Sequence, residues 1–402
     1  MNVEVKMKRI IRKITAALLC AVMVMSFTPQ AWAMEQDELA DRIYSARDCM
    51  VAFADRGDTD LLAQSDLLPA GSTLSDWTAI AFHLAGIDDD YDTYLKGLRE
   101  YVRSCYEKQG CIDRVRATEY HRIIMTVLSL GEDPTCFAED AGGKPIDLVA
   151  DGTYNYVGDS LGKQGLNGWI FALIALDSNG YEVPDGARYT REMIIDEILS
   201  SREENGAFGL VEGSPNADIT AMALQALSPY YAKRDDVREA VDDALGWLSG
   251  QLNEKCTFAS SDAYIDSESS ESISQVIIAL CCLGIDPEKD PRFIEEGVSI
   301  LSALEGFRRD DGGYVHTKDQ SSGDYMATQQ AMLALIAVYR LRSGGNPIYD
   351  LSGEASPITV SKSSPFSAKK TSGNIKAGYI ILPAAICLAA AAVLMKRRKS
   401  NA

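Results

Sequence analysis

The 402-residue sequence predicts an all-α protein in which one ring of helices lies inside another. Three observations lead to this fold class. Apolar runs recur about every 50 residues, amphipathic segments lie between them, and no run of alternating β-branched residues is long enough for a sheet. Repeats of this length are typical of a solenoid or a closed ring of two-helix units. The hydrophobic share of 46% and charged share of 24% indicate a folded chain.

The first 33 residues have the pattern of a secretory signal peptide. Basic residues precede the apolar run over 14–27, and Ala31 and Ala33 are the small residues that a cleavage site after Ala33 requires. An uncleaved anchor helix is the alternative, but the apolar run is short for a membrane span. We therefore expect export, with a mature chain that begins at residue 34.

Six apolar runs form the predicted inner helices, and each carries one anchor residue that aligns with the others. The separations between successive anchors are 45, 49, 51, 53 and 55 residues. The run over 220–230 is apolar on nearly every side except at Gln225, as in a helix that is buried all round. The anchors are Phe82, Val127, Leu176, Leu227, Leu280 and Leu335.

Amphipathic segments between these runs predict the outer helices. Residues 237–248 place apolar side chains at helical spacing and charged side chains opposite them, and Ile294–Leu304 behaves alike. The loop after an outer helix carries the pattern RxxxGx(F/Y) at 202–208 and 308–314, and 251–258 is a third example that is one residue longer. We expect the glycine to allow the turn and the aromatic residue to fill the space between neighbouring helices.

These units resemble the repeats of the terpenoid-cyclase and protein-prenyltransferase α/α toroid, which close with QxxxGxW; this chain has Arg for Gln at 202 and 308. The stretches 218–231, 271–287 and 312–333 are similar to exported Gram-positive surface proteins that carry this repeat. The resemblance covers about residues 75–350 and implies an α/α toroid of six inner and about six outer helices over 34–352.

The motifs that the family uses for chemistry are missing from this chain. It contains no DxDD acid of squalene-type cyclases, and no zinc ligand of the prenyltransferases matches at 269–273 or 324–327. Asp88–Asp92 fits the string DDxxD, but a loop and helix start is the favoured interpretation, with loosely bound calcium left open. We expect neither a resident metal nor a cofactor.

The cysteine and histidine contents favour neither a full disulfide framework nor a metal cluster. The seven cysteines between the signal and the C-terminal apolar run are an odd number, so a full disulfide framework is not indicated, although Cys105 and Cys111 are spaced to close a short loop. The sequence holds only three histidines, which is a poor basis for a His/Cys metal cluster.

Polar residues gather at the start of the predicted inner helices, whose N-termini should share one rim. Positions nine residues before each anchor are Thr73, Thr118, Asn167, Asp218, Glu271 and Met326. The predicted ligand-binding residues are Trp77, His121, Arg122, Asn167, Trp169, Asp218, Glu271, Gln275, Tyr325 and Gln329, with Gln330 beside them.

Each of these candidates has a structural alternative. Asp218 and Glu271 are either an acid/base carboxylate pair, as in glycan-cleaving toroids, or helix caps and first-turn charges. Trp77 and Trp169 either stack on a sugar or plug gaps between helices. His121, the third catalytic candidate, is either a base or a buried core histidine.

The C-terminal end predicts a membrane tether. Residues 353–376 are rich in Ser, Lys and Pro and read as a flexible stalk, and 377–395 are an uncharged apolar run long enough to cross a bilayer. The basic tail over 396–402 should remain in the cytoplasm, which leaves the large domain outside the cell. No LPxTG-type motif precedes the apolar run.

Charge and architecture together give three functional interpretations. The net charge of −19 argues against a nucleic-acid partner. The tether and the missing catalytic motifs favour a surface binding module for a glycan or a small ligand, with a corrinoid as one possibility by fold analogy. An extracellular hydrolase or lyase that uses Asp218 and Glu271 is the alternative, and a terpenoid cyclase-like enzyme comes third.

Overall fold

The computed structural model describes residues 34–54, 60–63, 66, 68–258, 268–353 and 357–359. The predicted signal peptide, membrane helix and basic tail lie outside these residues, as does most of the predicted stalk. Within the described ranges, no helix is both long enough and apolar enough to span a bilayer.

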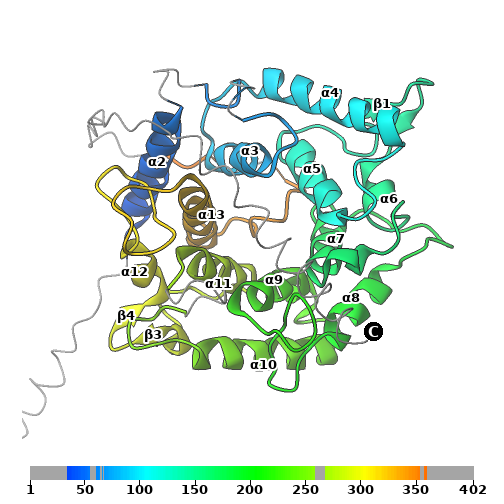
Figure 1. The fold of residues 1–402 in the computed structure, drawn as a ribbon. Coiled ribbons are helices and arrows are strands. Elements are labelled where there is room, and N and C mark those ends of the chain that lie inside the picture. The colour runs from blue at the N-terminus through cyan, green and yellow to red at the C-terminus, as the bar shows by residue number, and fades with distance from the viewer. Residues whose placement is uncertain are drawn as a thin grey trace, which may run out of the picture.

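Two concentric rings of helices make up the structure (Figure 1). Each inner helix packs against the next, and the last packs against the first, so that the inner ring is closed. All six anchors lie on inner helices and are fully buried, which confirms the predicted α/α toroid. The inner helices are α3 (Thr73–Ala85), α5 (Ala117–Ser129), α7 (Asn167–Asp177), α9 (Ala217–Leu227), α11 (Ser270–Cys282) and α13 (Tyr325–Arg342).

The outer ring encloses these helices and is completed by the first described helix. Helix α2 packs against α13, so the N-terminal helix covers the last inner helix. The outer helices are α2 (Gln36–Phe53), α4 (Tyr91–Gln109), α6 (Leu148–Gly152), α8 (Arg191–Ser200), α10 (Asp235–Gly250) and α12 (Ile300–Glu305). Three 3₁₀ turns connect elements: η1 (Leu161–Gln164), η2 (Ser228–Tyr230) and η3 (Pro291–Phe293).

One predicted outer helix is wrong in its first half. Helix α10 matches its amphipathic pattern, but residues 294–299 form a hairpin of β3 (Ile294–Glu295) and β4 (Val298–Ser299). Glu296 and Gly297 both take positive φ angles, 48° and 82°, which suit a two-residue hairpin turn and interrupt a helix. Ser299 then caps α12, since its hydroxyl accepts from the Ser302 amide.

Strand content in the described residues is confined to short hairpins. Apart from β3 and β4, a second hairpin joins β1 (Ala138–Glu139) to β2 (Pro145–Ile146), and every one of these strands is two residues long. The prediction of a ring without a significant sheet therefore agrees with the structure.

The three RxxxGx(F/Y)-type loops share one backbone turn. In each, the amide of the residue after the first motif position donates to the carbonyl four positions later, and the carbonyl of that residue accepts from the amide three positions later. Gly206 and Gly312 hold left-handed φ angles of 87° and 86°, and Cys256 holds the equivalent position with φ 57°. The third loop therefore has the same length as the others and begins at Leu252, which corrects the predicted extra residue. Its Phe258 is buried like the two other aromatic plugs.

The segment after α13 crosses the ring at the C-terminal ends of the inner helices (Figure 1, orange). The Leu351 amide donates to the Ser178 carbonyl at the end of α7, and the Ile358 amide donates to the Ala85 carbonyl at the end of α3. Ile358 is buried, so packing on the toroid extends past residue 352, where we predicted the stalk to begin.

The acidic string and the cysteine pair of the sequence analysis both lie in the described part of the chain. Asp90 caps α4 by accepting from the Thr93 amide at 3.0 Å, and Asp89 accepts from the amides of Leu61 and Leu62. The Asp88–Asp92 string is thus a loop and helix start, as favoured. Cys105 and Cys111 are both free thiols, so the short disulfide loop does not form in this structure.

Candidate functional site

The N-termini of the inner helices meet at one rim of the ring. The Arg122 guanidinium of α5 donates to the Thr73 hydroxyl of α3 at 3.2 Å, and the hydroxyls of Tyr325 and Thr78 lie 3.0 Å apart. The first turns of α3, α5 and α13 therefore lie at the same end of the ring. The residue nine positions before each anchor is the first or second residue of its inner helix. We call these residues the rim layer: Thr73, Thr118, Asn167, Asp218, Glu271 and Met326.

The two rim acids are not the N-caps of their helices. Asn216 caps α9, with its side-chain oxygen 2.8 Å from the Ile219 amide, and Ser269 caps α11 through the Ser272 amide. Capping therefore does not account for the carboxylates of Asp218 and Glu271, which lie two residues after the capping residues. Their location in the first turn still favours negative charge through the helix dipole.

Glu271 forms a carboxylate–imidazole pair with His316. Oε2 of Glu271 lies 2.8 Å from Nδ1 of His316, and it also accepts from the hydroxyls of Ser269 and Ser270 at 3.1 and 3.2 Å. The Glu271 side chain is 14% exposed and that of His316 is 33% exposed. The pair is thus held by the protein on one side and accessible on the other.

A well-anchored loop positions His316, a residue that sequence reasoning missed. The histidine follows the 308–314 turn, and its carbonyl accepts from the Ser270 amide at 3.2 Å. Nearby, the Lys318 ammonium contacts Glu268 at 3.0 Å and holds the same loop against the start of α11. The available clue was its place two residues after the aromatic plug Tyr314, because such loops border the rim.

The remaining rim positions are polar but differ in their contacts. The Thr118 hydroxyl donates to the Gln164 side chain at 3.0 Å. The side-chain oxygen of Asn167 is buried and has no hydrogen-bond partner among the described residues. Asp218 is half-buried, and its predicted pairing with Glu271 stays a prediction. In the described ranges, no group of three His, Cys, Asp or Glu residues is arranged to hold a metal ion.

One helical turn below the rim, equivalent side chains form what we call the central layer: Trp77, Phe171, Met222, Gln275 and Gln330. They lie four residues, or about 6 Å, further along their helices. The rings of Trp77 and Phe171 are 6.3 Å apart although α5 separates their helices, so both point into the ring. All five side chains are half-buried.

Tyr349 joins this layer from the opposite side. It belongs to the segment that crosses the far end of the ring, and its ring centroid lies 6.4 Å from that of Trp77 in an edge-to-face contact. The aromatic part of the central layer therefore comes from three distant parts of the sequence, and Tyr349 forms its base.

Two amide side chains, Gln275 and Gln330, belong to the other part of the central layer, and Gln225, three residues after Met222 on α9, joins them. Nε2 of Gln225 donates to both the carbonyl and the side-chain oxygen of Gln275 at 3.0 Å, and Nε2 of Gln275 donates to Oε1 of Gln330 at 3.1 Å. Oε1 of Gln225 is buried without a hydrogen-bond partner in the described part of the chain. The three amides form a chain across α9, α11 and α13.

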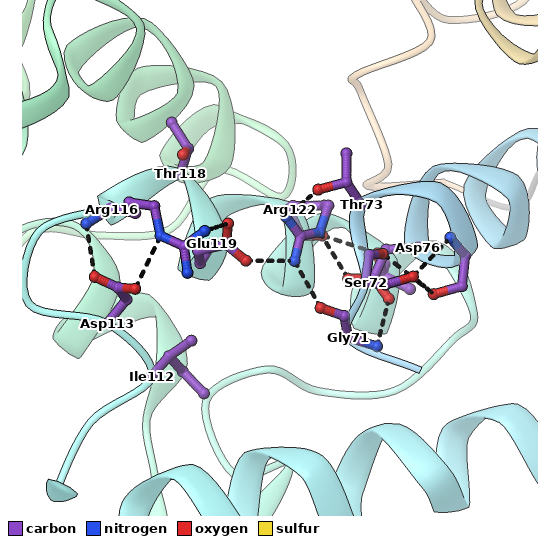
Figure 2. A network of polar contacts seen from close by, with 12 residues as sticks. Gly71, Ser72, Thr73, Asp76, Ile112, Asp113, Arg116, Thr118, Glu119 and Arg122 are labelled. Carbon is purple, nitrogen blue, oxygen red and sulfur yellow. Dashed lines mark hydrogen bonds and ion pairs between the residues drawn. The ribbon is translucent and has the colours of Figure 1, made fainter. Parts of the chain in front are cut away.

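The sixth equivalent position is Arg122, which is engaged in a buried ion network (Figure 2). Its guanidinium contacts Asp76 at 2.8 Å and Glu119 at 2.7 Å, and it donates to the Gly71 carbonyl at 2.8 Å. Burial opposes the charge on Arg122, but the two carboxylates outweigh it and raise its pKa. Burial, followed by the contact with Asp76, raises the pKa of Tyr94. Arg122 is consequently a structural residue.

His121 is a buried core histidine and does not line the rim. It is fully buried, and its Nε2 lies 2.7 Å from the Gly152 carbonyl of α6. Burial lowers its pKa to about 4, against the opposing effect of that hydrogen bond. A neutral ring that faces the outer helices has no access to a substrate, which corrects its proposed role as a base.

Three other predicted ligand contacts hold helices together. Trp169 packs edge-to-face on Tyr189 at 5.2 Å and so fills a gap toward the outer ring. Gln329 is buried and donates to the Leu74 carbonyl at 2.7 Å, which ties α13 to α3. Tyr325 packs on Phe53 at 5.8 Å in addition to its contact with α3. Of the predicted set, Glu271, Trp77 and Gln275 belong to arrangements that suit a ligand.

Comparison with solved structures supports the fold. An Asp-to-Asn variant of UGL with dGlcA-Glc-Rha-Glc matches with a TM-score of 0.51 and 14% identity, over 78% of this chain and 99% of that chain. Unsaturated glucuronyl hydrolase from Bacillus sp. GL1, described as responsible for the degradation of glycosaminoglycan, matches with a TM-score of 0.50 and 13% identity over the same shares. At identities this low, the two matches show a shared α/α toroid fold and nothing further.

A third solved structure is similar to a lesser degree. It is a variant of unsaturated glucuronyl hydrolase from Streptococcus agalactiae complexed with dGlcA-GalNAc6S, with a TM-score of 0.48, 10% identity and coverage of 76% of this chain and 92% of that chain. No protein-family model and no curated protein match the sequence. The solved structures support the predicted α/α toroid through glucuronyl hydrolases of this fold, and the finer likeness to terpenoid-cyclase repeats stays a prediction.

Proposed function

We propose that this toroid acts on glycans as a hydrolase or lyase, with Glu271 and His316 as its proton-transfer pair. The observation that carries the proposal is the 2.8 Å contact between the Glu271 carboxylate and Nδ1 of His316 at the rim of the inner ring. The solved structures of similar fold include glycan-degrading enzymes, which supports the same substrate class.

The chemistry of the pair follows from its geometry. A carboxylate that accepts from Nδ1–H fixes the orientation of the imidazole and stabilises its protonated form. The second ring nitrogen, Nε2, then exchanges the proton with the substrate, as a base in a lyase or as an acid or base in a hydrolase. Asp218, in the first turn of the neighbouring inner helix, is the second carboxylate that hydrolysis of a glycosidic bond requires.

A product analysis of the full-length protein tests this proposal. The probes are saturated oligosaccharides, acidic polysaccharides and the unsaturated disaccharide dGlcA-GalNAc6S. Hydrolysis of a saturated glycan creates a reducing end, a lyase creates an ultraviolet-absorbing double bond, and hydrolysis of the unsaturated disaccharide removes that absorbance. One of these changes is expected, and the absence of all three with folded protein would contradict the enzymatic assignment.

Variants of the pair give the sharper test. We expect Glu271→Gln and His316→Ala each to lower kcat by about 10²–10⁴-fold with little change in melting temperature, because general acid/base groups contribute factors of this size. His83→Ala is the matched control, since His83 lies near the C-terminal end of α3, away from the rim. Full activity in either rim variant would remove the pair from the mechanism.

A membrane-tethered glycan-binding module is the second candidate. The half-buried aromatic and amide side chains of the central layer favour ligand binding whether or not chemistry follows. Saturable glycan binding to the full-length protein without any product supports this candidate over the enzyme.

We also propose export, cleavage after Ala33 and membrane attachment through 377–395, on the basis of the two apolar runs and their basic flanks. Fractionation of cells and N-terminal sequencing of the mature protein test this location. Recovery from the cytosol with an intact N-terminus would contradict it.

A further inference from the structure

We infer that the central layer is a binding subsite for one uncharged pyranose ring, located one turn below the Glu271–His316 pair. The inference rests on the proposed action on glycans and adds the class of sugar that occupies the deep position. Its basis is the division of the layer into an aromatic side and an amide side.

The aromatic side supplies a stacking surface. Trp77 contacts Phe171 and Tyr349 edge-to-face at 6.3 and 6.4 Å, and all three side chains remain partly exposed. Trp77 and Phe171 lie on inner helices, and their contact across α5 directs both rings toward the interior of the ring. Apolar C–H faces of a pyranose pack on such rings, and large aromatics supply much of the contact area in ligand sites.

The amide side supplies hydrogen bonds that the protein itself leaves incomplete. Gln225, Gln275 and Gln330 form a chain of donors and acceptors on three successive inner helices. Gln225 is 3% exposed, and its Oε1 has no partner within the described ranges. A buried acceptor without a partner is costly, and a sugar hydroxyl satisfies such a group as a donor.

The layer is uncharged, which selects among sugars. The only charged residue at an equivalent position, Arg122, is already bound by Asp76 and Glu119 and cannot turn toward the ring interior without breaking those contacts. A uronate carboxylate in this layer would therefore be buried without a counter-charge. A neutral hexose or N-acetylhexosamine has the hydroxyl and amide groups that glutamine side chains recognise.

The depth of the layer relates it to the proposed chemistry. The central layer lies about 6 Å below the rim layer, a distance comparable to one sugar residue. A pyranose bound there would place its glycosidic oxygen at the level of Glu271 and His316.

Tryptophan fluorescence of the full-length Glu271→Gln variant tests the subsite without turnover. The probes are methyl glucoside, N-acetylglucosamine and glucuronate. We expect a saturable fluorescence change with the two neutral sugars and a weaker one with glucuronate. Trp77→Phe should abolish the signal, while Trp247→Phe on outer helix α10 should retain it.

Changes at Gln330 test specificity. Gln330→Leu should weaken binding of the neutral sugars about 10-fold, the effect of one lost hydrogen bond in a buried site. Gln330→Lys should shift the preference toward glucuronate, which a purely structural role of Gln330 would not do. Melting temperatures of both variants establish that they fold, and an unchanged preference in a folded Lys variant would overturn the subsite.

The results separate this inference from the proposed function. Neutral-sugar binding that depends on Trp77, without any turnover by the parent protein, supports the subsite and removes the enzymatic assignment. Glycan turnover by the parent, combined with no saturable binding of the three probes or with equal binding of neutral and acidic sugars, overturns the subsite and leaves the enzyme.

Discussion

The sector of the ring built from α3 and α5 differs from the sector built from α11 and α13 at the same depth. In the first sector, the polar residue at this depth is Arg122 of α5, beside Trp77 of α3, and Arg122 is buried and bound to Asp76 and Glu119. In the second sector, the polar residues at this depth are Gln275 and Gln330, which are half-buried neutral amides below the Glu271–His316 pair. The two sectors are equivalent in backbone and opposite in electrostatics.

The difference shows where a toroid can hold a functional site. A buried charge is tolerated only when partners neutralise it, so the groups around Arg122 are fully used by the protein. Amides have a smaller desolvation cost and can keep part of their hydrogen-bonding capacity for a ligand. Polar residues inside an apolar ring thus indicate function only when they keep unused hydrogen-bonding capacity and remain partly exposed.

The largest expected effect comes from the loss of one ion-pair partner in the charged sector. Asp76→Ala leaves Arg122 buried beside a single remaining carboxylate, and removal of one partner of a buried ion pair costs about 3–5 kcal/mol of unfolding free energy. Urea denaturation measures this change. Glu119→Gln, at the partly exposed edge of the network, should cost less, and equal losses for the two variants would contradict the assigned centre of the network.

The pH dependence of the unfolding free energy should reflect the burial of His121, which lies in the same sector as Arg122. The folded-state pKa of His121, about 4, lies below the ordinary value of 6.5, so the unfolded chain binds a proton first as the pH falls. The unfolding free energy should decrease by about 3 kcal/mol between pH 6.5 and pH 4 from this residue alone. His121→Gln removes the titration, and its stability curve over this range should be flatter than that of the parent. Parallel curves would show that His121 titrates normally.

The turn loops compare a glycine and a cysteine at the same left-handed backbone position. Gly312→Ala forces a side chain onto φ 86°, with its Cβ only 2.7 Å from the Ser45 carbonyl, so we expect a loss of about 2 kcal/mol. Cys256→Gly relieves the left-handed strain but removes a buried thiol, and its net change should stay within about 1 kcal/mol. Thermal unfolding compares the two, and a smaller loss for Gly312→Ala would contradict the shared turn.

The smallest expected effect lies in the amide sector. Gln225→Leu removes a buried acceptor without a partner in the described structure together with the two hydrogen bonds that Nε2 donates to Gln275, and these effects oppose each other, so the unfolding free energy should change by less than about 1 kcal/mol. Denaturation under the same conditions as for Asp76→Ala gives the contrast. A loss as large as that of Asp76→Ala would show that the amide chain is a structural network like the charged one.

The inner ring and its direction could be predicted from the amino-acid sequence. The anchors, the apolar helices and the shared N-terminal rim follow from hydrophobic periodicity, which is a local property that burial on all sides preserves. The position of Glu271 in the first turn could be predicted for the same reason. The hairpin at 294–299 could not, because its side chains fit helical spacing and the positive φ angles of Glu296 and Gly297 decide the backbone.

The pairing of residues at the rim and in the interior depends on how distant parts of the chain pack together. His316 reaches Glu271 through a loop that is held against α11, and Tyr349 reaches Trp77 through a segment that crosses the ring. Trp77 and Trp169 both lie in the first two turns of an inner helix, yet one faces the interior and the other faces Tyr189. The physical reason is that partners and orientation depend on which neighbouring helix a side chain packs against, and that neighbour comes from a distant part of the chain.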